Sequence, residues 1–325
     1  MLIQLTTPEG RQIKPLTDAY LDMELSDGER DFVLTFNRSE YNEQITYGSR
    51  IFVHGTEYGG IIGELGTSTS QDTITWTGYT WRGLMAKKLI LPPEGQDYYT
   101  VNDELNNVLR NLIEPMFSGV FIVPEIDTGV NINWKFDRFC TLLDGLTKML
   151  KSVNYRLNIS YNQGEPNGVG WVEVTAVPIK DWSTEIELSE DSQLHFSMTN
   201  KRNGVNHLVI GEKGELQNRN VIHLYVQADG SIGKNQYYKG IDEIVEFYEN
   251  TSSEDVESYG IDRLKSIMNK SVFDMDIESL GIDVPIGDIV GGRDHITGMY
   301  ASSPVGNIIL KLENGNISKE YRLEG

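Results

Sequence analysis

The sequence predicts a mainly β protein with a mixed α/β insertion. Three observations predict this class: short segments in which apolar and polar residues alternate, glycine-rich turns between those segments, and two middle stretches with apolar residues at helical spacing. The chain of 325 residues contains 16 Tyr, 10 Phe, 5 Trp and 32 Gly, a composition typical of an ordered and strand-rich protein. A chain of this length indicates two or three domains.

Residues 1–90 are predicted to form a first β-barrel. Apolar and polar residues alternate on both sides of Asp27-Gly28, a dipeptide typical of hairpin turns. The alternating apolar residues are Leu21, Met23, Leu25, Phe32, Leu34 and Phe36. A later strand at 73–79 places on one face Ile74, Trp76 and Gly78. Pro92-Pro93 then marks the end of this domain.

Residues 91–200 are predicted to form a mixed α/β domain. Thr100 is expected to cap a helix that ends before Pro115 and has an apolar stripe made of Val101, Leu105, Val108, Leu109 and Leu112. A second helix is expected at 137–152, with a stripe made of Phe139, Leu142, Leu143, Leu146, Met149 and Leu150. Alternating segments at 155–161 and 171–177 then predict two paired strands.

Residues 201–325 are predicted to form a second β-barrel, interrupted by a helical insertion at about 236–270. Strands are expected at 205–211 and 221–227, and Thr251-Ser-Ser-Glu254 resembles a helix capping box. The last part of the chain, 272–325, reads as strands and turns, with a hairpin closed by Asn314-Gly315. The aromatic and apolar residues of this region therefore indicate a return to β structure.

Two segments far apart in the chain have a similar pattern. Ile45-Thr-Tyr-Gly-Ser-Arg-Ile, followed at 59–63 by Gly-Gly-Ile-Ile-Gly, parallels Val284-Pro-Ile-Gly-Asp-Ile-Val, followed at 305–310 by Val-Gly-Asn-Ile-Ile-Leu. The shared feature is a glycine after an apolar-x-apolar triplet. Two interpretations are open: an internal repeat, or two unrelated barrels that use the same turn glycines.

Charge and cysteine content exclude several classes of protein. The formal net charge is −20, from 28 basic and 48 acidic residues. This charge argues against a surface that binds nucleic acid or an anionic membrane. The single cysteine excludes an internal disulfide framework. The N-terminal residues lack the basic head and apolar run of a signal peptide, and no stretch has the length of a membrane span. We therefore expect synthesis in a cytoplasm.

The sequence predicts no catalytic, cofactor or metal site. It lacks the common zinc-protease, phosphate-loop, dinucleotide and nucleophile-elbow motifs. Histidines at 54, 195, 207, 223 and 295 have no metal-ligand spacing, and Cys140 is expected to be a packing residue. Two groups of carboxylates have a possible functional interpretation. Asp274, Asp276 and Glu278 could bind a cation, or could form the solvent-exposed face of a strand. Glu125 and Asp127 could form the carboxylate pair of a glycosidase.

Three sequence segments resemble segments of the phage tail hub family. They are Thr77-Gly-Tyr-Thr-Trp-Arg-Gly-Leu-Met-Ala-Lys-Lys-Leu-Ile-Leu-Pro-Pro, Tyr259-Gly-Ile-Asp-Arg-Leu-Lys and Ile286-Gly-Asp-Ile-Val. Members of this family are the baseplate or tail-tip hubs of long-tailed phages and prophages, and often form the N-terminal module of tail-associated lysins. The resemblance covers about residues 20–323. Because the sequence ends at Gly325 without a peptidase or muramidase domain, no lytic activity is expected.

The resemblance implies a structural hub that forms a homotrimeric ring. Two tube-like β-barrels per chain would alternate around a channel, so that three chains imitate the sixfold tail tube. Implied partners are the distal tail protein or tail tube ring, the tip, spike or receptor-binding proteins, and the tape-measure protein. The implied location is the virion tail tip, after synthesis in the host bacterial cytoplasm. No cofactor, stable nucleic-acid binding or membrane insertion is expected.

The ring interface is predicted in the two similar segments, at Ile45, Gly48, Ser49, Ile51, Ile286, Gly287, Asp288, Ile289 and Val290. Two alternatives from other functional classes are a tail-associated cell-wall hydrolase and a carbohydrate-binding adhesion module. For the second, the expected aromatic platform is Trp76, Tyr79 and Trp81, which a core or interface position would also explain.

Overall fold

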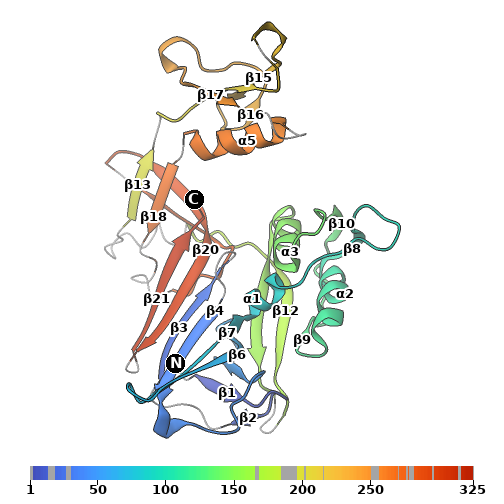
Figure 1. Ribbon diagram of the computed structural model, residues 1–325, viewed down its shortest axis with the longest axis vertical. Helices are drawn as coiled ribbons and strands as arrows, with labels where there is room; N and C mark the ends of the chain where they lie inside the picture. The colour runs from blue at the N-terminus through green and yellow to red at the C-terminus, as the bar shows by residue number, and fades with distance from the viewer. Residues whose placement is uncertain are drawn as a thin grey trace. The chain divides into compact units, whose positions relative to one another are not determined.

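The computed structural model describes residues 3–13, 19–26, 31–164, 168–183, 196–200, 203–214, 216–249, 256–269, 271–275, 277, 282–294, 296–313 and 316–324. The chain divides into two compact units (Figure 1). The larger unit comprises Met1–His195 and Met275–Gly325, and the smaller unit is Phe196–Asp274. The smaller unit is therefore an insertion in the sequence of the larger one.

A ten-stranded sheet forms much of the larger unit. Its strands are β1 (Gln4–Thr6), β2 (Gln12–Ile13), β3 (Ala19–Leu25), β4 (Asp31–Asn37), β5 (Arg50–Phe52), β6 (Gly59–Ser68), β7 (Thr73–Thr80), β19 (Ile289–Arg293), β20 (Tyr300–Glu313) and β21 (Asn316–Leu323). The order is β19-β20-β3-β4-β7-β6-β5-β1-β2, and β21 also pairs with β20. A 3₁₀ helix, Arg38–Glu40, follows β4.

The alternating segments of the sequence form the strands that they predict. In the β3–β4 hairpin, Leu21 pairs with Leu34, and both side chains are buried. In β7, Ile74 and Trp76 are buried on one face. These side chains form the core because alternate residues of a strand point to the same side.

Strands from both ends of the chain share this sheet. Leu310 of β20 pairs with Met23 of β3, and Figure 1 shows the red C-terminal strands beside the blue N-terminal ones. The mainly β class is therefore confirmed, whereas the division into two separate barrels at 1–90 and 201–325 stays a prediction. In the described residues the path of the sheet is open, from β19 to β2.

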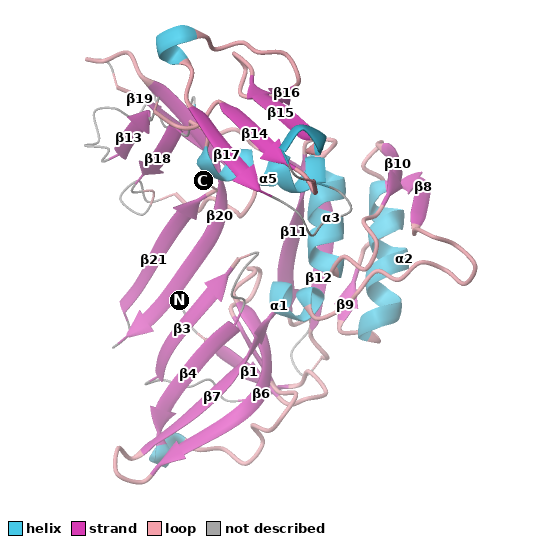
Figure 2. Cartoon of the chain, turned by 45° about the horizontal axis from the view of Figure 1, so that its top comes forward, coloured by secondary structure: helices cyan, strands magenta, loops and turns pink. Residues whose placement is uncertain are grey.

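The middle of the chain forms a small α/β layer. Its elements are α1 (Trp81–Ala86), β8 (Thr100–Glu104), α2 (Leu105–Phe117), β9 (Phe121–Ile122), β10 (Asn131–Lys135), α3 (Leu142–Lys151), β11 (Tyr155–Asn162) and β12 (Trp171–Pro178). β11 and β12 are antiparallel, as predicted, and β9 joins β12. Figure 2 shows α2 and α3 beside this sheet. Apolar residues of the helices and the sheet form one core.

Two helix starts differ from the prediction. α2 begins at Leu105, because Val101 pairs with Trp134 of β10 in a strand ladder and Glu104, rather than Thr100, caps the helix. Pro115 lies inside α2, in its last turn.

α3 begins later than predicted. Phe139 precedes it, has a φ of 60°, and is half exposed. It is therefore not part of the apolar stripe. The cap of α3 is Thr141, whose hydroxyl accepts a hydrogen bond from the Asp144 amide at 3.1 Å.

The smaller unit is a four-stranded sheet covered by one helix. The strands are β14 (His207–Gly211), β15 (Val221–Val226), β16 (Ile232–Gly233) and β17 (Val245–Glu249), in the order β16-β15-β14-β17, and the helix is α5 (Val256–Ile267). β13 (Phe196–Asn200) pairs with β18 (Ser271–Met275), and the 3₁₀ helices are Leu216–Asn218 and Gly240–Asp242. The predicted helical insertion at 236–270 thus also contains a strand, because β17 pairs with β14.

Several predicted features lie outside the described residues: the turns at Asp27-Gly28 and Asn314-Gly315, the capping box at Thr251–Glu254, His195, His295, Asp276 and Glu278. None of the helices in the described part of the chain is both long and apolar enough to span a membrane.

Candidate functional site

The predicted interface residues lie in or directly beside two turns of the same construction. In each turn the amide of the fourth residue donates to the carbonyl oxygen of the first, at 3.0 Å in 46–49 and 3.2 Å in 285–288. The third residue is a glycine in both, with a φ of 88° at Gly48 and 92° at Gly287. Glycine occupies this position because residues with a side chain rarely adopt a positive φ.

The hairpins that follow these turns also correspond. The amide of Gly48 donates to the carbonyl of Ile62 at 2.9 Å, and the amide of Ile62 donates back to the carbonyl of Ser49 at 2.8 Å. The same two bonds join the turn 285–288 to Val305, at 2.8 and 2.9 Å. β5 and β6 in the first copy therefore match β19 and β20 in the second.

A β-bulge follows at the same place in both copies. The register shifts around Gly63 where β6 pairs with β7, and around Gly306 where β20 pairs with β21. Each glycine directly follows the residue that bonds to the turn. Turn, strand and bulged strand recur together, which favours an internal repeat over the chance use of common turn glycines.

The side chains of the predicted interface are mostly buried within this chain. Gly48 and Ile289 are partly exposed, and the buried members are Ile45, Ser49, Ile51, Ile286, Gly287, Asp288 and Val290. Their role in a ring interface stays a prediction. In the chain itself they form core contacts beneath the two turns.

At the last position of the turn the two copies differ in charge, with Ser49 in the first and Asp288 in the second. The Asp288 carboxylate is 1% exposed. It accepts hydrogen bonds from Arg156 Nε at 2.6 Å, the Lys180 amide at 2.9 Å and Trp182 Nε1 at 3.1 Å. The Ser49 hydroxyl accepts a bond within its own turn, at 3.0 Å. The second turn is therefore tied to the α/β layer by a buried ion pair.

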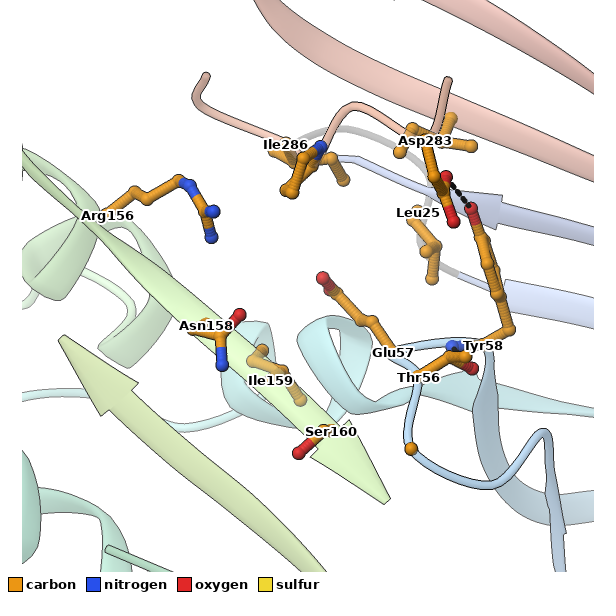
Figure 3. Close-up of a pocket in the computed structure, with 13 residues that line it drawn as sticks. Leu25, Thr56, Glu57, Tyr58, Arg156, Asn158, Ile159, Ser160, Asp283 and Ile286 are labelled. Atoms are coloured by element: carbon orange, nitrogen blue, oxygen red, sulfur yellow. Dashed lines mark hydrogen bonds between the residues drawn. The ribbon is translucent and has the colours of Figure 1, made fainter. Parts of the chain in front are cut away.

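A cavity of about 290 Å³ lies beside the second turn. It is lined by the loop 55–58, by β11 and by the segment 283–286 (Figure 3). Glu57 and Arg156 are directed toward the space from opposite sides. Glu57 is paired with Arg82, whose Nη2 lies 3.2 Å from Glu57 Oε2, and Arg156 is paired with Asp288.

The third acidic group at the cavity, Asp283, is also bound by neighbouring side chains. Its Oδ1 lies 2.9 Å from Lys319 Nζ and accepts hydrogen bonds from Tyr321 at 3.0 Å and Tyr58 at 3.3 Å. Burial, with a further contribution from the negative charge of Asp283, raises the pKa of the Tyr58 phenol well above its ordinary value. Tyr58 is thus a neutral donor, and the charges around the cavity are compensated by partners from the chain.

β11 connects the surroundings of the two turns. At one end Arg156 binds Asp288. At the other end the Gly55 amide donates to the Tyr161 carbonyl, and the Tyr161 amide donates to the Thr56 carbonyl, both at 2.9 Å. One strand of the α/β layer is therefore fixed to both copies of the repeat.

The carboxylate pair that the sequence offers as a glycosidase alternative lies in the segment after β9. Glu125 and Asp127 are exposed and line a hollow of about 370 Å³ with Glu104. Burial acts to raise the pKa of Glu104, but hydrogen bonds from Thr128 and the start of α2 outweigh it and hold that pKa below its usual value. Asp127 accepts a bond from the amide of Gly129 at 2.7 Å. These contacts give Glu104 and Asp127 structural roles.

The aromatic platform is not formed as an exposed surface. Trp76 and Trp81 are 2% and 0% exposed, whereas Tyr79 is 45% exposed. The two tryptophans are core residues, as the alternative interpretation predicted. Burial, followed by the charge of Asp137, raises the pKa of the Cys140 thiol, which partly packs against the core of the α/β layer. Cys140 is therefore a packing residue, as predicted.

Sequence reasoning missed the residues that meet only through the fold. Arg156 and Asp288 are 132 positions apart, and no local pattern relates them. His207 and His223 were assigned no shared role, yet their side chains meet across the pairing of β14 with β15. The alternation of residues in the two strands was the only available signal, because it places both histidines on one face.

Comparisons with known proteins identify the fold. No protein-family model matches the chain, and no curated protein matches its sequence. The tail protein from Neisseria meningitidis MC58 is similar in structure, with a TM-score of 0.50, 11% identity, and coverage of 100% of this chain and 96% of that one. The 43 kDa tail protein of prophage MuSo2 from Shewanella oneidensis has a TM-score of 0.53 at 14% identity, with coverage of 100% and 98%.

Proposed function

We propose that this chain, which has the fold of phage tail proteins as the sequence resemblance predicted, is a structural hub protein at the distal tip, or baseplate, of a phage or prophage tail. The observation that carries the proposal is the structural match with two tail proteins over the full length of this chain and nearly the full length of each of them. A match of this extent covers both units rather than one common motif.

The proposed assembly is a homotrimeric ring that joins the sixfold tail tube to the tip or spike. The repeated turns and hairpins support this, because three chains with two similar copies each present six similar elements to a sixfold neighbour. The two copies would belong to two tube-like β-domains around a channel. The net charge of −20 suits a channel wall that repels a passing genome.

The proposed role is non-enzymatic. The acidic side chains that line the cavity beside the second turn, Glu57 and Asp283, are paired with Arg82 and Lys319. The partners would be the distal tail protein or tail tube ring, the tip, spike or receptor-binding proteins, and the tape-measure protein.

The mass of the purified full chain in solution tests the proposal. Light scattering across a concentration series should give three times the chain mass of 36.7 kDa, and electron microscopy of that species should show a ring with a channel. A monomer that stays monomeric on addition of a matching tail tube ring would contradict the hub assignment. Digestion of bacterial cell wall by the chain alone would support the hydrolase instead.

A further inference from the structure

The smaller unit contains a chain of three side chains that the proposed function does not use. His207 Nδ1 lies 2.7 Å from Glu243 Oε1, and His207 Nε2 lies 2.8 Å from His223 Nδ1. Gln236 donates to the same Glu243 oxygen at 2.8 Å. Two imidazole nitrogens thus face each other at hydrogen-bond distance, next to a carboxylate that is held in place.

The carboxylate determines which ring nitrogen carries a proton. An ionised carboxylate only accepts hydrogen bonds, so Nδ1 of His207 must donate to Glu243, and Nε2 of the neutral ring has a free lone pair. That lone pair points at His223, whose Nδ1 supplies the shared proton. A histidine oriented in this way by a carboxylate is the usual arrangement behind a metal-bound imidazole.

The two rings are held by rigid elements. His207 lies on β14 and His223 on β15, which pair in register, and the Tyr225 ring stacks on His207 with centroids 4.3 Å apart. His207 is 9% exposed, whereas His223 is exposed to solvent. The pair therefore combines the buried ring of His207, which packs against Tyr225, with the ring of His223, which is accessible to solvent.

We propose that His207 and His223 form a binding site for a divalent transition metal ion, with Zn²⁺ as the biological candidate. The ion would lie between the two facing nitrogens, and the proton on Nδ1 of His223 would move to Nε2 of the same ring, so that each facing nitrogen has a lone pair for the ion. Zinc–nitrogen bonds of about 2.0–2.1 Å in tetrahedral geometry put two ligand nitrogens about 3.4 Å apart. The nitrogens are 2.8 Å apart, so a small rotation of the exposed His223 ring opens the site.

The donor atoms determine the class of ion. Imidazole nitrogens suit Zn²⁺, Cu²⁺ and Ni²⁺, whereas Mg²⁺ and Ca²⁺ need oxygen ligands. Within the described residues, no group of three or more His, Cys, Asp and Glu side chains is placed to hold an ion together. The site therefore provides two protein ligands, and water takes the remaining positions. Glu243 is a positioning residue that touches His207 rather than the ion.

Zinc titration of the full chain, prepared without a histidine tag, tests the site. Isothermal calorimetry should show one Zn²⁺ per chain. His223→Ala should abolish this binding while the circular dichroism spectrum stays unchanged, because His223 is exposed. Mg²⁺ should give no saturable signal.

Two further variants complete the test. Glu243→Gln should weaken Zn²⁺ binding by about 10-fold or more, through loss of the orientation of His207, without changing the stoichiometry. His54→Ala is the matched control, because His54 is also exposed but lies in the other unit, and it should bind like the wild type. Absence of saturable Zn²⁺ binding, or binding that survives His223→Ala, would overturn the proposal.

Discussion

At the scale of single residues, Asp288 gives the second copy of the repeated turn a buried ion pair, where the first copy has Ser49. Its carboxylate is buried and neutralises Arg156, whose side chain is 12% exposed. Removal of one partner from a buried ion pair leaves the other charge buried without a counter-charge. The resulting loss of folding free energy is far larger than the net contribution of the intact pair to stability. The turn 285–288 therefore depends on a charge that the turn 46–49 does not need.

Asp288→Asn is predicted to lower the free energy of unfolding of the larger unit by about 3 kcal/mol, because the buried guanidinium of Arg156 loses its counter-charge. Urea unfolding followed by tryptophan fluorescence measures this unit alone, since all 5 tryptophans of the chain lie in it. The control Asp137→Asn removes an exposed pair with Lys148 and should change stability by less than about 0.5 kcal/mol. Equal losses in both variants would contradict the role of Asp288.

At the scale of elements, the start of α2 shows how a carboxylate fixes a helix. Glu104 Oε2 accepts the Asn107 amide at 2.9 Å, and Oε1 accepts the Thr128 amide at 2.9 Å. One side chain thus caps the helix and holds the loop after β9. Caps of this kind contribute about 1 kcal/mol to helix or protein stability.

Glu104→Gln is predicted to destabilise the larger unit at neutral pH and to lose this effect in acid. The folded-state pKa of Glu104 is lowered, so the contribution of its carboxylate is present above the ordinary value of 4.5 and is lost as the pH falls through the folded-state pKa. Urea midpoints of wild type and variant should therefore differ at pH 7 and converge in acid. The exposed Glu94→Gln serves as control, and a difference that is constant with pH would contradict the assignment.

The elements show what a sequence pattern can predict. The β3–β4 hairpin follows from local alternation, because each strand has one face in the core. The start of α2 does not follow, since Val101 has helical spacing and becomes a strand residue only by pairing with Trp134. The repeated turns were predictable from their glycines, whereas the contact of Arg156 with Asp288 was not, because it depends on long-range packing.

At the scale of the whole molecule, the predicted ring interface needs a test that separates assembly from folding. The only charged residue in 287–292 is Asp288, so a charge reversal there would act on the buried ion pair. The next residue, Arg293, is exposed and is the last residue of β19, the strand that follows the turn. It is the better position at which to change the surface of the repeat.

Arg293→Glu is predicted to lower the fraction of trimer in solution while the urea midpoint of the larger unit stays close to that of the wild type. The change places a negative charge beside the repeated segment of a chain that is already acidic, which raises repulsion between neighbours. Glu165→Lys, in the loop 162–170, is the control and should leave the trimer unchanged. Light scattering measures both, and equal effects would count against an interface at the repeat.

The attachment of β11 to both copies of the repeat has a mechanical consequence. This strand is paired with β12 along all eight of its residues, from Tyr155 to Asn162. The pairing keeps β11 extended, so this strand has little length to give when a force pulls the two copies of the repeat apart. A flexible loop in the place of β11 would lengthen under the same force before its end contacts broke. The contacts of Arg156 and Tyr161 at the two ends of the strand are therefore expected to break before β11 itself lengthens.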